Sequence, residues 1–448
     1  MKRTYQPLLS YSFLVTTMLI LSSCSWLGLD DGSKKIPLTG ERVSVLELQK
    51  NLEAIDTTLK AEGFVGPKPW SNDFWTQAGG YPNHNLQNVT LSEGQLKKIW
   101  SKDIGSGKSD GFPLTSQPVV FNGIIYTVDT ESKIKAFDIK TGKNLWENNL
   151  RPENEDENVI GGGLAVAADF LYATNGYGEI LALNSKEGGI SWRTKLTAPS
   201  RAAPTVVGDK LYVLTLDNRL TALDAKTGKQ IWKYEGFSET AGLINAASPA
   251  ADGDVVISPM SSGELTALRA DNGSVTWSDS LSPSMQTGGV SALPDIAALP
   301  VIDKGSVIAV SYGGKIVSID MATGQRIWTR DIGGAKDPWV SGNMIFFISS
   351  NAELIALGRD TGALAWVKSL SSYDDEGKSS NSLMWNGPLL AGNRLLVTSA
   401  GESLLEISPQ DGSLIRKNDL GFHVALPPIV AGRTLYLISD DGTLSAWK

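Results

Sequence analysis

The sequence predicts an all-β fold, an eight-bladed β-propeller. A pattern A-x-D-x-x-T-G-x-x-x-W, with substitutions, recurs seven times between Asp138 and Arg416, and its turn glycines lie 38 to 51 residues apart. A repeat of that period is typical of propeller blades. A second pattern, a short β-branched and aromatic strand, recurs eight times, starting at residues 124, 170, 210, 255, 306, 344, 394 and 434. We therefore count eight blades.

Residues 1–23 have the features of a signal peptide. A short basic segment precedes an apolar stretch from Leu8 to Leu21, and small residues follow it. The segment Leu-Ser-Ser-Cys that ends at Cys24 resembles a bacterial lipobox, which implies diacylglycerol on the thiol and an acyl chain such as palmitate on the new amino terminus. The alternative is an ordinary secretory signal with an incidental cysteine. Because the chain has one cysteine, we favour lipidation, and Ser25 favours sorting to the outer membrane.

The polar composition of residues 24–69 predicts a tether. Residues 70–95 are predicted to form an irregular strap on the propeller surface. The strap is dense in Trp, Gly and Pro, and we expect its His84 to be a surface residue rather than a ligand. The tether contains one stripe of apolar residues at helical spacing, which predicts a short helix: Val45, Leu48, Leu52, Ile55 and Leu59.

Residues 96–448 form the predicted propeller. In residues 203–236, four short runs separated by turn residues describe an antiparallel meander. The last blade lacks its outer strand, because the chain ends with a third strand at Lys448. Residues 96–104 match the missing fourth strand, so we expect them to pair with the carboxyl-terminal strand and close the ring.

The repeated motif has a structural explanation that needs no ligand. Its Asp or Asn accepts hydrogen bonds from the turn backbone, and its glycine supplies a positive φ. Position 416 is Arg where Trp is expected, so we predict that the seventh blade is the least firmly docked. The tryptophans are predicted to dock blades together: Trp100, Trp146, Trp192, Trp232, Trp277, Trp328 and Trp366.

Composition narrows the function classes. The formal net charge is −8 and the isoelectric point is near 5.1, which argues against a nucleic-acid partner. The chain shows no nucleotide-binding glycine fingerprint and no metal-ligand spacing among its two histidines. We therefore predict no cofactor and no metal.

The best copies of the motif, D-x-x-T-G-K-x-x-W at residues 138–146 and 224–232, resemble the tryptophan-docking repeats of the quinoprotein, or PQQ-like, propeller family. Within it, a lipoprotein signal followed by eight blades and no catalytic domain is similar to the BamB family of the β-barrel assembly machinery. That resemblance implies an outer-membrane lipoprotein facing the periplasm, a non-catalytic scaffold that assists insertion of β-barrel proteins. Its implied partners are the POTRA domains of BamA, other lipoproteins of the complex and unfolded outer-membrane proteins.

The PQQ-like resemblance also implies an alternative, a periplasmic PQQ-dependent dehydrogenase. Such enzymes hold PQQ over the central channel with Ca²⁺ and a catalytic Asp. Asp295 and the acidic run at residues 153–157 are not spaced like a calcium loop. We therefore read the run as a solvated loop and favour the scaffold.

The resemblance also implies a partner surface. The BamB contact with BamA involves the connections after the third and fourth blades, here residues 241–250 and 285–300. The match is incomplete, because Ile244 stands where the family motif has arginine. Apolar loop residues would suggest an interface if they are exposed, but they could instead tuck under neighbouring blades. The candidate contacts are Leu243, Ile244, Asp295 and Ile296.

Overall fold

The computed structural model describes residues 54–448 except 238–242, 244–245, 283–292, 372 and 376–377. The predicted signal peptide, Cys24 and most of the predicted tether lie outside these residues. Residues 54–448 form one compact unit. No helix in this part of the chain is long and apolar enough to cross a membrane.

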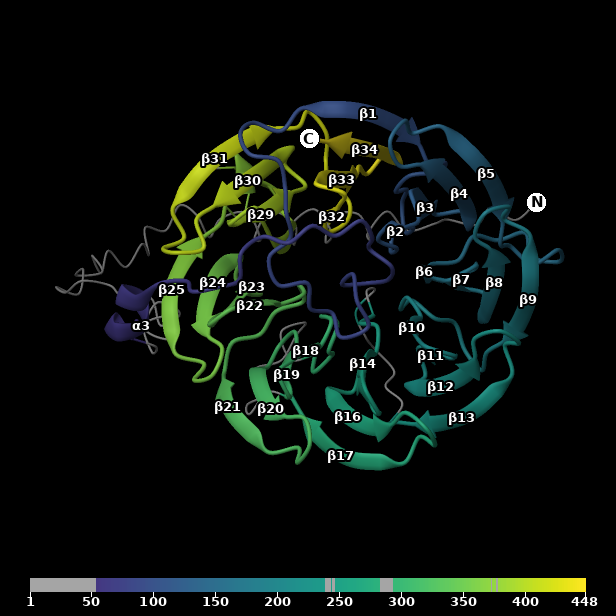
Figure 1. Cartoon of the computed structure of the whole chain (residues 1–448), viewed down its shortest axis with the longest axis horizontal. Helices are drawn as coiled ribbons and strands as arrows, with labels where there is room; N and C mark the ends of the chain where they lie inside the picture. The colour runs from purple at the N-terminus through teal and green to yellow at the C-terminus, as the bar shows by residue number, and fades with distance from the viewer. Residues whose placement is uncertain (1–53, 238–242, 244–245, 283–292, 372, 376–377) are drawn as a thin grey trace, which may run out of the picture. The chain divides into compact units, whose positions relative to one another are not determined.

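Eight four-stranded antiparallel sheets follow one another around a ring, which confirms the predicted fold (Figure 1). Each of the first seven blades runs from its innermost to its outermost strand in chain order. Blade 1 comprises β2 (Val119–Phe121), β3 (Ile124–Val128), β4 (Lys133–Asp138) and β5 (Asn144–Asn149). Blade 2 comprises β6 (Gly162–Ala167), β7 (Phe170–Asn175), β8 (Glu179–Asn184) and β9 (Ile190–Lys195). Blade 3 comprises β10 (Thr205–Val207), β11 (Lys210–Leu214), β12 (Arg219–Asp224) and β13 (Gln230–Glu235).

The second half of the ring repeats this plan. Blade 4 comprises β14 (Ala250–Asp252), β15 (Val255–Pro259), β16 (Glu264–Arg269) and β17 (Val275–Ser280). Blade 5 comprises β18 (Val301–Asp303), β19 (Ser306–Val310), β20 (Ile316–Asp320) and β21 (Arg326–Arg330). Blade 6 comprises β22 (Trp339–Ser341), β23 (Met344–Ile348), β24 (Glu353–Gly358) and β25 (Leu364–Ser369). Blade 7 comprises β28 (Trp385–Ala391), β29 (Arg394–Ser399), β30 (Ser403–Ile407) and β31 (Leu414–Asp419).

Blade 8 joins the two ends of the propeller. It comprises β32 (Ile429–Ala431), β33 (Thr434–Ile438), β34 (Thr443–Trp447) and, as its outer strand, β1 (Lys98–Asp103). Trp100 lies opposite Ala446, and the backbones of Lys97 and Lys448 exchange hydrogen bonds of 2.9 and 3.0 Å. The predicted closure by an amino-terminal strand is therefore confirmed.

The core lies between blades. The cluster between blades 2 and 3 combines Tyr172, Ile180 and Ala182 of one with Leu211 and Leu223 of the other. The second and third strands are buried on both faces, whereas outer strands such as β9 alternate between exposed and half-buried residues. Blades therefore gain their stability by packing against their neighbours.

Each docking tryptophan lies against the turn glycine of the next blade. A Cβ on Gly228 would lie 2.5 Å from the Trp192 ring, and Gly142 approaches Trp100 in the same way. The outer strands have a register shift beside the tryptophan, which re-aims the side chain toward the next blade. Most of these indoles also donate to a carbonyl of the same turn: Trp146 to Ser185 at 3.1 Å, Trp232 to Ala270 at 3.1 Å, Trp277 to Met321 at 2.8 Å, Trp328 to Arg359 at 2.8 Å and Trp366 to Pro409 at 3.2 Å.

The seam between blades 7 and 8 is built differently. Blade 8 has no glycine turn there, because its third and fourth strands come from opposite ends of the chain. Arg416 occupies the docking position and donates to the Gly94 carbonyl. It also pairs at 3.2 Å with Glu406, which is fully buried and binds Arg394 at 3.0 Å and Asn418 at 2.8 Å. The break in the motif thus coincides with the break in the chain.

The strap, residues 70–95, crosses the centre of the ring and bonds to every blade (Figure 1). It contacts Gly342, Gly392 and Gly432 in the turns between first and second strands, so it closes that end of the channel. Its bonds reach blades 8 and 1 to 7 in turn: Asn72 with Val430, Trp75 with Val120, Thr76 with Val166, Gln77 with Val206, Pro82 with Ala251, Asn83 with Ile302, Gln87 with Trp339 and Val89 with Leu390.

The strap corrects one expectation from the sequence. His84 is 6% exposed rather than a surface residue. Its Nδ1 lies 2.7 Å from the Pro300 carbonyl, and burial lowers its pKa to about 4. The imidazole is therefore neutral at neutral pH, with the proton on Nδ1.

Two small elements lie outside the blades. Helix α3 (Thr57–Glu62) is capped by Asp56, whose backbone N–H donates to the Leu364 carbonyl of blade 6. Leu59 of this helix packs against the core between blades 6 and 7. Of the predicted apolar stripe, only Ile55 and Leu59 lie among the described residues. Strands β26 (Tyr373–Asp375) and β27 (Lys378–Ser382) pair after blade 6.

Candidate functional site

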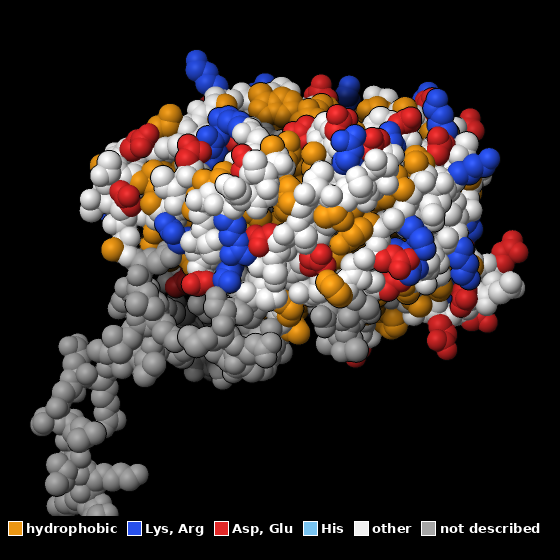
Figure 2. All heavy atoms as spheres, turned by 90° about the horizontal axis from the view of Figure 1, so that it is seen from below, with side chains coloured by type: hydrophobic (Ala, Val, Ile, Leu, Met, Phe, Trp, Pro, Cys, Tyr) orange, Lys and Arg blue, Asp and Glu red, His pale blue; other side chains and the backbone are white. Residues whose placement is uncertain are grey.

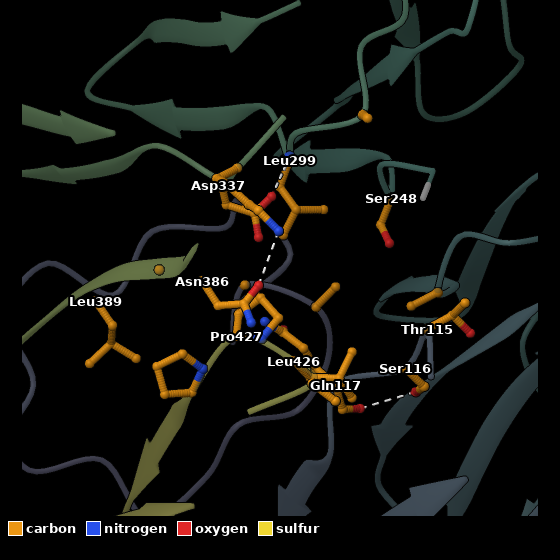
Figure 3. Close-up of a pocket in the computed structure, with 18 of the residues that line it drawn as sticks. Thr115, Ser116, Gln117, Ser248, Leu299, Asp337, Asn386, Leu389, Leu426 and Pro427 are labelled. Carbon is orange, nitrogen blue, oxygen red and sulfur yellow. Dashed lines mark hydrogen bonds between the residues drawn. The ribbon is translucent and has the colours of Figure 1, made fainter. Parts of the chain in front are cut away.

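A cavity of about 210 Å³ occupies the centre of the ring. The strap residues Trp75, Gly79 and His84 form its floor. Its walls come from residues within or just before the innermost strands of all eight blades, among them Thr115, Leu164, Ala203, Ser248, Leu299, Pro338, Asn386 and Leu426. Figure 3 shows Asp337 and Asn386 on one side of this space and Thr115 and Ser248 on the other.

The charged side chains that line the cavity include Lys108, Arg201 and Asp440 as well as Lys336 and Asp337, which lie in the connection that enters blade 6. The Lys336 ammonium donates to Asn386 Oδ1 at 3.0 Å, and Asp337 Oδ1 accepts from the Leu299 backbone at 2.8 Å. Burial lowers the pKa of Lys336 and raises the pKa of Asp337. Both charged forms are therefore disfavoured by removal from water.

The channel wall also connects to the predicted partner loops. Arg201, which lines the cavity, donates to the Leu243 carbonyl at 3.4 Å. The Leu243 backbone N–H donates to Asp295 Oδ2 at 2.7 Å. Two connections that are distant in sequence, after blades 3 and 4, are thus joined through the backbone of one residue.

The predicted contact residues differ in their exposure. Leu243 is half-buried, and Ile244 lies outside the described residues. Asp295 is 4% exposed, and burial raises its pKa to about 6. Ile296 is 1% exposed and packs in the core between blades 4 and 5. Ile296 is therefore not part of an exposed apolar cluster; it is buried under the neighbouring blades.

Comparison with known proteins bears on what this ring does. Residues 130–368, more than half of the chain, match the family model described as outer membrane protein assembly factor BamB. The chain belongs to the BamB family. A BamB of Yersinia pestis is 25% identical over 358 residues, covering 78% of this chain and 88% of that protein. A BamB of Escherichia coli is 24% identical over 352 residues, covering 77% and 87%.

Solved structures share the fold. The crystal structure of a BamB from Moraxella catarrhalis matches with a TM-score of 0.66 and 20% identity, covering 79% of this chain and all of that one. A quinohemoprotein alcohol dehydrogenase from Comamonas testosteroni matches with a TM-score of 0.63 and 13% identity, covering 84% and 80%. The BamB fold is therefore close to that of enzymes as well as of assembly factors, and fold alone does not assign an activity.

The central cavity of this BamB-family chain does not fit a calcium-bound quinone. Among the described residues, no group of three or more His, Cys, Asp or Glu side chains could hold a metal ion. Calcium needs six to eight oxygen ligands, whereas the cavity offers the carboxylates of Asp337 and Asp440, and Asp440 pairs with Lys108 at 3.2 Å. The acidic run at residues 153–157 is exposed. The donor set is thus too sparse.

Sequence reasoning missed the cavity and its charged wall. Lys336 and Asn386 are distant in the chain and meet because blades 6 and 7 are neighbours in the ring. The strap floor was equally hidden, since its bonds involve mainly backbone atoms. A charged Lys-Asp pair immediately before a first strand was the available signal.

Proposed function

We propose that this chain is a non-catalytic scaffold of the outer-membrane β-barrel assembly complex. The observation that carries the proposal is the family match over residues 130–368, because that family is described as an assembly factor. The sparse metal donors of the channel support a role without redox chemistry.

The test is purification of the lipoprotein in detergent, followed by identification of its bound proteins. We expect the POTRA-bearing barrel-assembly protein BamA and other lipoproteins of the complex. The quinoprotein alternative predicts instead that PQQ and Ca²⁺ restore dye-linked dehydrogenase activity. Dehydrogenase activity together with the absence of BamA would contradict the scaffold proposal.

We further propose that the chain is anchored to the outer membrane through Cys24 and faces the periplasm. The lipobox resemblance supports this, and two or more acyl chains give stable anchoring where one does not. Labelled palmitate should enter the wild-type protein and not Cys24→Ser. Equal labelling of both would refute the anchor.

We propose that the two joined connections form the BamA contact. In this arrangement Asp295 acts as an internal tie that fixes the backbone at Leu243, rather than as a direct contact. Leu243→Asp should weaken BamA binding, because it places a charge on the half-buried residue at the centre of the proposed contact. Leu145→Asp on the outer strand β5, an exposed residue of the same type, is the matched control. Equal binding by Leu243→Asp, or equal loss in the control, would show that the contact lies elsewhere.

Unfolded outer-membrane proteins are further proposed partners, through the free edges of outer strands. Exposed apolar residues on these strands include Ile99, Leu145 and Ile327. Apolar patches alternate with charged ones on the side of the ring that Figure 2 shows. Crosslinking from position 145 to an unfolded barrel protein would support this contact, and absence of crosslinks would oppose it.

A further inference from the structure

The central cavity is a pocket with one closed end. The strap seals its floor with Trp75 and His84, and the walls are largely apolar, with Leu164, Leu299 and Leu389 among them. Its volume of about 210 Å³ is below that of pockets for drug-sized ligands. It therefore suits a ligand of roughly ten non-hydrogen atoms.

Lys336 is a cation in this wall without a direct counter-ion. Its ammonium has three N–H donors, and one hydrogen bond, to the neutral amide of Asn386, is formed. No ion pair joins it to a carboxylate within the described ranges. Lys336 is half-buried, and a cation that has lost part of its water is stabilised by a paired anion, so its remaining N–H donors can take up an anion from the channel.

The neighbouring Asp337 does not supply this anion. Its carboxylate accepts from the Leu299 backbone and attracts Lys336 only from beyond ion-pair distance. Burial also raises the pKa of Asp337. Asp337 is tied through Leu299 to the connection before blade 5, whereas Lys336 keeps N–H donors that no protein side chain takes up among the described residues. Desolvated ionisable groups in a pocket are typical of functional sites.

We propose that the channel binds a small organic acid whose carboxylate pairs with the Lys336 ammonium. The apolar part of the ligand packs against the leucines of the wall, and Asn386 holds the ammonium in place. A carboxylate is favoured over a neutral ligand because it supplies the missing counter-ion, and over an amine because a second cation would repel the first. The site goes beyond the assembly role and does not depend on it.

The probes are phenylacetate, phenylacetamide and phenethylamine, which share an aromatic body and differ in charge. Titration calorimetry on the folded full-length protein should show phenylacetate binding at least about tenfold more tightly than the amide, as expected for a charge-assisted hydrogen bond. Phenethylamine should not bind. Equal binding of the three, or no binding of phenylacetate at millimolar concentration, overturns the proposal.

Two variants locate the binding. Lys336→Met and Lys336→Gln should each weaken phenylacetate binding at least about tenfold, and thermal unfolding should show that both remain folded, since each removes a half-buried charge. Lys195→Met on the outer strand β9 is the matched control, because that lysine is exposed and distant from the channel. Unchanged binding in the Lys336 variants means that phenylacetate binds elsewhere and rejects the site.

Discussion

At the scale of single residues, the repeated glycine meets two separate demands. Gly228 has φ of +68°, which favours glycine, and it also lies against the Trp192 ring, where a Cβ would come within 2.5 Å. Gly208, in the turn before β11, has φ of +60° but open space around it. A substitution at Gly208 therefore reports on backbone strain alone, whereas the same substitution at Gly228 adds a steric clash with the tryptophan ring.

We predict that Gly208→Ala costs about 1 kcal/mol of unfolding free energy, the cost of a left-handed residue. Gly228→Ala should cost about 1–3 kcal/mol more, because the added methyl group overpacks the blade interface. Urea unfolding followed by tryptophan fluorescence measures both. Equal losses would mean that the tryptophan yields without cost and that the glycine serves the turn alone.

A second prediction at this scale concerns pH. Burial raises the pKa of Asp295 to about 6 from an ordinary 3.8, so the native state binds its proton more tightly than the unfolded state does. The stability from this carboxyl is thus fully present below about pH 4 and is lost as pH rises through about 6. Asp295→Asn keeps an acceptor for Leu243 and removes the desolvated charge.

The variant should therefore be more stable than wild type by about 1–3 kcal/mol near pH 8, and this difference should vanish near pH 4. Thermal unfolding across that range is the measurement. Leu243→Ala, which adds no titratable group and leaves Asp295 with its backbone hydrogen bond, should retain the wild-type pH profile and serves as the comparison. A constant difference at all pH values would show that the charge is not the cause.

At the scale of elements, the seam between blades 7 and 8 shows why one repeat departs from the pattern. Tryptophan docks onto a glycine turn, and blade 8 has none because Lys97 and Lys448 meet there as separate chain segments. Arg416 reaches the Gly94 carbonyl and the buried Glu406 instead. An ionic cluster therefore replaces the aromatic contact where the glycine turn is missing.

We predict that Arg416→Trp, which restores the repeat, destabilises the protein by about 1–3 kcal/mol, because the buried Glu406 loses one charged partner and keeps Arg394 and Asn418. The double variant Arg416→Trp with Glu406→Gln should recover part of this loss. Hydrogen exchange in β28 to β31 also tests whether blade 7 is the least firmly docked. If Arg416→Trp instead stabilises the protein, tryptophan docking contributes more at this seam than the ionic cluster of Arg416 and Glu406.

The blades could be predicted from sequence because each is a local meander with its own turn signals, and the closing strand followed from the missing fourth strand of the last blade. Three features could not. The strap bonds largely through its backbone, which leaves no periodic side-chain pattern. His84 was therefore predicted at the surface, although it is buried. Ile296 lies in an irregular connection, where exposure depends on neighbouring blades. Lys336 and Asn386 meet only once the ring has closed.

At the scale of the whole molecule, the ring is closed twice. Blade 8 ties β1 to the carboxyl-terminal strand at the perimeter. The strap ties the innermost strands together at the centre and contributes Trp75, Leu86 and Val89 to the core of blades 7, 8 and 1. Because one short segment bonds to all eight blades, loss of the strap should loosen blades that are far from the perimeter closure.

We predict that replacing residues 72–89 by a glycine-serine chain of equal length lowers the unfolding free energy by roughly 5–10 kcal/mol, since several large apolar side chains lose their burial. Hydrogen exchange should rise in the inner strands of blades 4 and 5 as well as in blade 8, because the strap bonds to Ala251 and Ile302 there. The same replacement of residues 153–157, an exposed loop, should leave exchange in these strands unchanged. Faster exchange confined to blade 8 would mean that the perimeter strand alone holds the ring and that the strap merely lines the channel.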